Sequence, residues 1–176
     1  AGRLLFDAAM NGPVVVACVQ AEPVVLDCEA SIEKLAVLTA EAAGNGASLV
    51  VFPEAFLPAY PSSAWAKALA GWDDPRAKAA FALLARESVA VPGPGEGRIR
   101  EVAREHGAIV ATGVTETDVE RNGTLYNTLL VHDEHGSLVL KHRKLVPTNH
   151  ERLVWGQGDG AGLRAVRCVQ ARGQRE

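Results

Sequence analysis

The sequence has few cysteines, few aromatic residues and no excess of one charge. Three of its 176 residues are cysteine and 5% are aromatic. With 18 basic and 21 acidic residues the net charge is −3, which gives no electrostatic basis for binding nucleic acid or an anionic membrane. No apolar run approaches the roughly 20 residues that a membrane-spanning helix needs. The remaining composition, 48% hydrophobic and 22% charged, is that of an ordinary globular domain.

The three cysteines, Cys18, Cys28 and Cys168, form neither a paired disulfide framework nor the spacing of metal ligands. Their odd number, without a convincing secretory signal at the start, predicts a reducing, cytoplasmic location. Cys18 lies within an apolar run, so we expect it in the core. A helix N-terminus could lower the pKa of Cys28, but we interpret it as a helix-start residue without catalytic meaning.

Three of the five histidines lie close together in the sequence: His132, His135 and His142. They flank a turn, whereas a metal site needs ligands that converge and partners that hold them in place. We therefore interpret this group as the solvated end of a hairpin and expect no metal there.

Apolar strands alternate with amphipathic helices along the chain. Apolar runs predict strands at 13–20, 49–52, 108–114, 125–131 and 138–140. Helical spacing and end signals predict helices at 28–43, 75–88 and 99–106. Residues 92–95, Pro-Gly-Pro-Gly, read as a linker turn. This order predicts an α/β domain with a mixed sheet and flanking helices.

Three further features of these elements predict how they begin, end and pack. The continuous apolar run at 13–20 is typical of a strand buried on both faces. Asp27 and Asp74 are suited to cap the first two helices, and Gly107 is suited to end the third. The strand, helix and strand between residues 13 and 52 predict a parallel pair joined by a crossover.

A carboxylate and an ammonium each follow an apolar strand. Glu54 comes after Pro53 at the end of the run 49–52, and catalytic groups in α/β sheets gather outside the carboxyl ends of strands. Apolar neighbours there would partly desolvate Glu54 and favour proton exchange near neutral pH. From residue type alone, a surface glutamate in a turn is the commoner outcome.

Lys144 ends the basic cluster 141–144, Lys-His-Arg-Lys. For Lys141 and Arg143 we expect a solvated strand end. Lys144 differs, because Leu145-Val146-Pro147 follows it and returns the chain toward the core. A buried lysine near a carboxylate is suited to stabilise a developing oxyanion.

At these segments the chain resembles the nitrilase branch of the carbon–nitrogen hydrolase superfamily. The similar segments are 16–21 (VACVQA), 51–56 (VFPEAF), 126–128 (YNT), 141–148 (KHRKLVPT), 151–152 (ER) and 155–160 (WGQGDG). The resemblance covers nearly all of residues 13–163, and the segment 155–160 is more similar to nitrilases than to amidases of the same superfamily.

The resemblance implies a fold, a reaction and residue roles. The fold would be the N-terminal portion of an α-β-β-α sandwich. Glu54 would be the general base, Lys144 would stabilise the tetrahedral intermediate, and Glu151 would orient the lysine and the substrate. A cysteine would attack a nitrile to form a thioimidate, and hydrolysis would yield a carboxylic acid and ammonia without a metal or organic cofactor. Relatives of this kind imply a homo-oligomer.

The family's nucleophilic cysteine has no counterpart in these 176 residues. Cys168 lacks the Gly-rich apolar stretch that presents the family thiol, and it follows Lys144 too soon. We therefore divide the chain into an N-terminal extension (1–12), an incomplete hydrolase domain (13–163) and an aberrant arginine-rich tail (164–176). We predict that this C-terminally truncated chain is inactive. The alternatives are a non-catalytic fragment that associates with full-length relatives and an amidase-type member.

Overall fold

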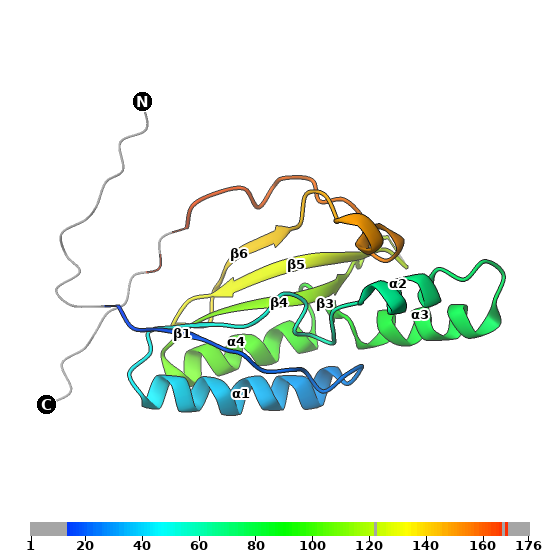
Figure 1. Ribbon diagram of the computed structural model, residues 1–176. Coiled ribbons are helices and arrows are strands. Elements are labelled where there is room, and N and C mark those ends of the chain that lie inside the picture. The colour runs from blue at the N-terminus through cyan, green and yellow to red at the C-terminus, as the bar shows by residue number, and fades with distance from the viewer. Residues whose placement is uncertain (1–13, 122, 167, 169–176) are drawn as a thin grey trace, which may run out of the picture.

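Six strands form one mixed sheet in the computed structural model, which describes residues 14–121, 123–166 and 168 (Figure 1). The strands are β1 (Val16–Cys18), β2 (Leu49–Val51), β3 (Val89–Ala90), β4 (Ile109–Thr117), β5 (Leu125–His132) and β6 (Leu138–Arg143). Their order is β1-β2-β4-β5-β6, and β3 pairs with β4. β1, β2 and β4 run parallel, whereas β5 is antiparallel to both β4 and β6. The predicted α/β class and mixed sheet are confirmed.

The helices are α1 (Cys28–Gly44), α2 (Ser63–Leu69), α3 (Pro75–Glu87), α4 (Pro94–His106) and the 3-10 helix η1 (Asn149–Leu153). α1 and α4 lie side by side against one face of the sheet (Figure 1). α2 and α3 lie beyond the end of the sheet at which β6 ends, and α2 contacts η1. The predicted caps are present, since Asp27 accepts a hydrogen bond from Ala30 N and Asp74 accepts one from Arg76 N.

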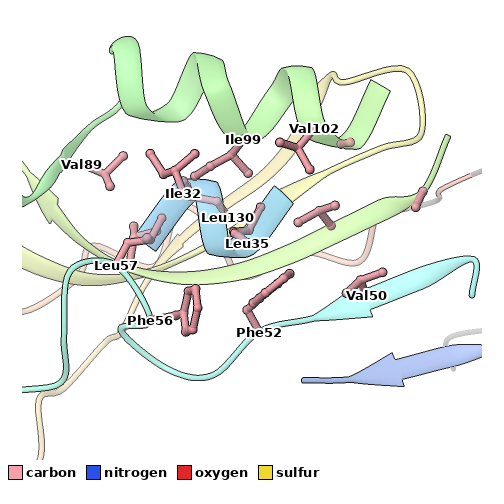
Figure 2. Packing of buried hydrophobic residues seen from close by; sticks show 14 of the residues in the cluster. Ile32, Leu35, Val50, Phe52, Phe56, Leu57, Val89, Ile99, Val102 and Leu130 are labelled. Carbon is pink, nitrogen blue, oxygen red and sulfur yellow. The ribbon is translucent and has the colours of Figure 1, made fainter. Parts of the chain in front are cut away.

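The main core lies between the sheet and this helical layer (Figure 2). Ile32 and Leu35 from α1 meet Ile99 and Val102 from α4 over the sheet residue Leu130. Helical spacing places each pair on one face of its helix, as the sequence predicts for α1. Phe52 and Phe56, whose ring centroids are 5.1 Å apart, extend this core to the end of β2.

The first strand is exposed, which corrects two predictions. Val14 and Val16 keep 50% and 47% of their surface exposed, and Cys18 is exposed rather than in the core. Within the described chain β1 has β2 as its sheet neighbour and lies at the edge of the strand order. An apolar run therefore predicts the strand but not which of its faces is covered.

Several element boundaries also differ from the prediction. α4 begins at Pro94, because proline is favoured in the first turn of a helix, so 92–95 is not wholly a linker turn. β4 and β6 extend three residues beyond the predicted ends, to Thr117 and Arg143. The short elements α2 and β3 have no clear periodic signal, and the prediction lacked both.

The three clustered histidines do not share one solvated site. His135 is exposed, but His132 is fully buried and its Nε2 lies 2.9 Å from Glu96 Oε1. Glu96, on α4, is itself 2% exposed and pairs with Arg100. The solvated-hairpin interpretation is therefore wrong for His132, because β5 alternates its side chains and turns this one toward α4.

Two boundary predictions fall largely outside the described residues. The predicted extension, 1–12, lies outside them, as do residues 167 and 169–176 of the predicted tail. None of the helices in the described part of the chain is long and apolar enough to cross a membrane.

Candidate active site

Glu54 is placed by a turn that packs directly against β4. The turn follows β2, and Ala55 within it has a positive φ of 47°. Beyond it, Leu57 N donates to Gly113 O and Thr115 N donates to Leu57 O, which fixes the turn to β4. A Cβ at Gly113 would lie 2.6 Å from Ala55 N and 2.7 Å from Glu54 Cα. The missing side chain of Gly113 therefore lets the Glu54 turn approach the strand.

Lys144 directly follows β6, and its backbone N–H and carbonyl both form hydrogen bonds that fix its position. Its N–H donates to Asn127 O at 2.7 Å, and its carbonyl accepts from Gly158 N at 3.0 Å. The segment 156–162 runs back along this strand, so Lys144 lies between β5 and that segment. The Lys144 side chain is 31% exposed, so it is less buried than the sequence analysis expects.

Glu151 lies in η1 and is 3% exposed. Its carboxylate closes a capping box with Thr148, whose backbone N–H donates to Glu151 Oε2. The other oxygen, Oε1, accepts from Tyr60 Oη at 2.8 Å and from Lys144 Nζ at 3.0 Å. These donors satisfy a carboxylate that would otherwise be costly to bury.

The three residues singled out in the sequence meet at one point. Lys144 Nζ lies 3.0 Å from Glu54 Oε1 and 2.8 Å from Glu151 Oε2, so its ammonium bridges the two carboxylates. Asn127 Nδ2 donates to the same Glu54 oxygen. A pocket opens beside them, and its walls are Phe52, Glu54, Gly113, Asn127, Thr128, Leu129, His142 and Lys144.

Burial and hydrogen bonding shift the pKa values of Lys144 and Glu151 in opposite directions. Burial alone would lower the pKa of Lys144, but its hydrogen bonds to Glu151 and Glu54 outweigh this and raise that pKa. Burial would likewise raise the pKa of Glu151, but hydrogen bonds from Lys144, Thr148 and Tyr60 lower it. The pair is therefore ionised at neutral pH.

Glu54 itself differs from the prediction. Its side chain is 49% exposed in the described structure, so the expected partial desolvation is wrong. Phe52 and Phe56 are buried in the core, and Phe52 also lines the pocket, but about half of the Glu54 side chain remains exposed. Glu54 therefore faces the open pocket with one oxygen held by Lys144 and Asn127.

The described thiols lie apart from this pocket. Cys28 contacts Glu87 at the start of α1, and burial followed by nearby acids raises its pKa to about 11, so the helix start does not activate it. Burial, followed by the negative charges of Glu134 and Asp133 in the turn before β6, raises the pKa of Cys168. Lys144 follows the opposite end of β6, a six-residue strand that is about 20 Å long at 3.3 Å per residue.

Arg143 and Lys141, beside Lys144, are paired with a buried carboxylate, which corrects the prediction of a merely solvated strand end. Arg143 and Lys141 both bind the carboxylate of Glu116, which is 1% exposed, at 2.6 and 2.9 Å. Arg143 also lies 3.9 Å above the ring of Tyr126. The basic cluster 141–144 therefore has two sets of partners. Lys141 and Arg143, at alternate positions of β6, point toward Glu116, whereas Lys144, which follows the strand, contacts Glu54.

Three contributors to the site were not assigned a role from the sequence. Asn127 lies within a segment that carried the family resemblance, but its contact with Glu54 depends on the pairing of β4 with β5. Gly113 shows no motif, and only the approach of the Glu54 turn explains it. Tyr60 lies in a Pro-rich segment with no regular periodicity.

The sequence pattern described as carbon-nitrogen hydrolase matches residues 15–171. The chain belongs to the carbon-nitrogen hydrolase family. This confirms the resemblance stated from the segments around Glu54 and Lys144.

Curated relatives of this family member carry nitrilase names. A nitrilase from Paraburkholderia phymatum is 42% identical over 144 residues, which cover 81% of this chain and 39% of the relative. An aliphatic nitrilase from Sinorhizobium fredii is 45% identical over 150 residues, which cover 85% of this chain and 47% of the relative. The chain thus spans less than half the length of these relatives.

Solved structures show the same fold. An amidase from Nesterenkonia sp. matches this family member with a TM-score of 0.60 and 20% sequence identity, over 83% of this chain and 48% of that one. At this identity the likeness establishes the fold of the N-terminal portion and nothing about the substrate. Among the residues that the structure describes, no three His, Cys, Asp or Glu side chains gather as a metal site would require.

Proposed function

We propose that this chain carries the general base and the oxyanion-stabilising lysine of a nitrile-hydrolysing site. Glu54 is the base, Lys144 stabilises the negative charge that develops on the substrate, and Glu151 orients Lys144. The observation that supports this proposal is the ammonium of Lys144, which bridges an exposed and a buried carboxylate at the wall of a pocket. A lysine held in this way keeps its charge and its direction.

The proposed reaction uses a cysteine as the nucleophile. Glu54 takes the thiol proton while sulfur bonds to the nitrile carbon, and Glu54 then passes this proton to the nitrile nitrogen, which gives a thioimidate and leaves Glu54 ionised. Water then adds to that carbon, the tetrahedral intermediate faces Lys144, and ammonia leaves to give a thioester. A second water, deprotonated by Glu54, releases the carboxylic acid and returns the proton to sulfur.

The 176 residues alone are proposed to be inactive. The described thiols neither line the pocket nor bond to Glu54 or Lys144. Losing a covalent nucleophile costs on the order of a million-fold in turnover. The purified chain should therefore release no ammonia from aliphatic or aryl nitriles above the level of buffer. Ammonia release that is lost on Cys168→Ala would instead identify Cys168 as the nucleophile.

A chimaera tests the assigned residues. Residues 14–163 would be joined to the remaining C-terminal part of the Sinorhizobium fredii aliphatic nitrilase, the 45% identical relative. We expect nitrile turnover, and a loss of about a thousand-fold on Glu54→Gln or on Lys144→Ala. Lys67→Ala, on an exposed residue of α2, is the matched control. Equal activity of the Lys144→Ala and Lys67→Ala chimaeras would refute the assignment.

Nitriles are the proposed substrates because the relatives at 42% and 45% identity bear nitrilase names. The amide alternative is separated by assaying the chimaera on a nitrile and on its matched amide. Preference for the amide would move the proposal to the amidases.

Association is a second proposed property. β1 lies at the edge of the described sheet, and Val16 in it and the preceding Val14 and Val15 are exposed, so the chain offers a surface for pairing with another copy or with a full-length relative. The described cysteines are all free thiols, which supports the proposed cytoplasmic location.

A further inference from the structure

We propose that Tyr60 is a positioning residue that holds Glu151, and through it Lys144, in the bridging geometry; this rests on the proposed function of that pair. Tyr60 Oη donates to Glu151 Oε1 at 2.8 Å, the oxygen that also accepts from Lys144 Nζ at 3.0 Å. Two donors therefore share one carboxylate oxygen. The Thr148 backbone N–H donates to the other oxygen, Oε2, which also lies 2.8 Å from Lys144 Nζ, so the carboxylate is held at both oxygens.

The Tyr60 ring is itself held in place. Its centroid lies 5.7 Å from the buried Trp155 ring and 6.2 Å from the His150 ring, both in edge-on arrangements. Trp155 is in turn joined to Glu151, because its backbone N–H donates to Glu151 O at 2.8 Å. The ring thus spans from the segment after β2 to η1, which the sequence separates by about ninety residues.

The burial of Glu151 explains why a third donor is needed. The carboxylate is 3% exposed, so water contributes little to its solvation. Lys144 is shared with Glu54, and Thr148 supplies a single backbone N–H. Without the Tyr60 hydroxyl, Glu151 would depend on Lys144 at Oε1 and would bind a proton more readily. A protonated Glu151 would no longer hold the ammonium toward Glu54.

The contact with Glu151 also affects the pKa of the Tyr60 hydroxyl. Burial, followed by the hydrogen bond to Glu151, raises the pKa of Tyr60 to about 12, so the hydroxyl remains a donor throughout the neutral range. A hydroxyl that never ionises there can hold Glu151 without competing for its proton.

Carbon-detected NMR of the 176-residue chain labelled with ¹³Cδ-glutamate tests this proposal without any turnover. Tyr60→Phe keeps the ring and removes the hydroxyl. We expect it to increase the proton affinity of Glu151 about tenfold, since a hydrogen bond to an ionised group is lost. The Lys144 ammonium signal in ¹⁵N spectra should weaken as its exchange with water accelerates. Tyr126→Phe, which removes the chain's other tyrosine hydroxyl, should change neither signal.

A second measurement covers the case in which Tyr60→Phe does not fold. 3-Fluorotyrosine, incorporated into the Tyr126→Phe chain, labels Tyr60 alone and makes its hydroxyl a stronger donor. The proton affinity of Glu151 should then fall. An unchanged Glu151 titration in both samples, or an equal change in Tyr126→Phe, would overturn the positioning role. Because neither sample needs activity, this failure is distinct from failure of the chimaera to hydrolyse nitriles.

Discussion

Lys144 joins two carboxylates that differ in burial, and this difference separates their roles. Glu151 is 3% exposed and has three donors, which keep it ionised and fixed. Glu54 is 49% exposed and faces the pocket, where it can exchange a proton with a reacting group. The same residue type therefore serves as a support in one position and as a candidate base in the other.

The buried pair His132–Glu96 predicts a loss of stability in weak acid. Burial, despite the bond to Glu96, lowers the pKa of His132 below its usual 6.5, and no partner for its Nδ1 is found among the described residues. A neutral imidazole thus donates from Nε2 to Glu96. The unfolded chain takes up the proton first, so His132 stabilises the fold above about pH 6.5 and this contribution is lost as pH falls through the lower, folded value.

Urea unfolding of the chain between pH 7.5 and pH 5 would measure this effect. The free energy of unfolding should decrease across the interval, and less so in His132→Gln, which cannot titrate. His135→Gln, on an exposed histidine of the next turn, should follow the unmodified chain. A slope that is the same in all three proteins would contradict a neutral buried His132.

At the scale of elements, the approach of the Glu54 turn to β4 depends on Gly113. In Gly113→Ala the added Cβ would meet the backbone of Pro53, Glu54 and Ala55, which cannot yield as a flexible side chain can. We expect a loss of about 1–3 kcal/mol in the free energy of unfolding. We also expect the Glu54–Lys144 contact to be displaced, as shown by a change in the Lys144 ammonium signal.

Gly97→Ala is the matched control for this substitution. Gly97 lies inside α4, and a Cβ there meets nothing within 4 Å. Alanine is the better helix former, so this change should stabilise the chain by about 0.5–1 kcal/mol. Opposite signs for the two glycines are the expected result. Tolerance of Gly113→Ala would show that the turn does not need this close approach.

At the scale of the whole molecule, the exposed edge at β1 predicts self-association. Val16 in the edge strand and Val14, two residues before it, are 47% and 50% exposed. Light scattering after size exclusion should show a mass that rises with concentration. Replacing both valines with lysine should reduce it, because charged side chains on an edge strand oppose strand pairing.

Val119→Lys adds one such charge at a valine that is 64% exposed in the turn after β4. This control should leave the association unchanged. A single mass at all concentrations of the unmodified chain would contradict the prediction, and an equal effect of Val119→Lys would assign the association to net charge.

Much of the fold follows from local patterns. α1 and α3 begin at capped positions that Asp27 and Asp74 mark in the sequence, and the apolar runs 49–52 and 125–131 became β2 and β5. Predictions of environment were less successful. The surroundings predicted for Cys18, His132 and Arg143 were wrong. Burial depends on which element covers a strand, and the sequence of one strand does not identify that element.

The sequence by itself determined the α/β class, the parallel start of the sheet and the two charged residues after strand ends, Glu54 and Lys144, on which the proposed function rests. Local chemistry suffices for these, since strand periodicity, caps and short segments are encoded by adjacent residues. Tertiary structure alone decided that Lys144 bridges Glu54 and Glu151, that Tyr60 supports Glu151, and that Gly113 admits the Glu54 turn. These contacts join residues that lie far apart in the chain, and only the folded sheet brings them within hydrogen-bonding distance.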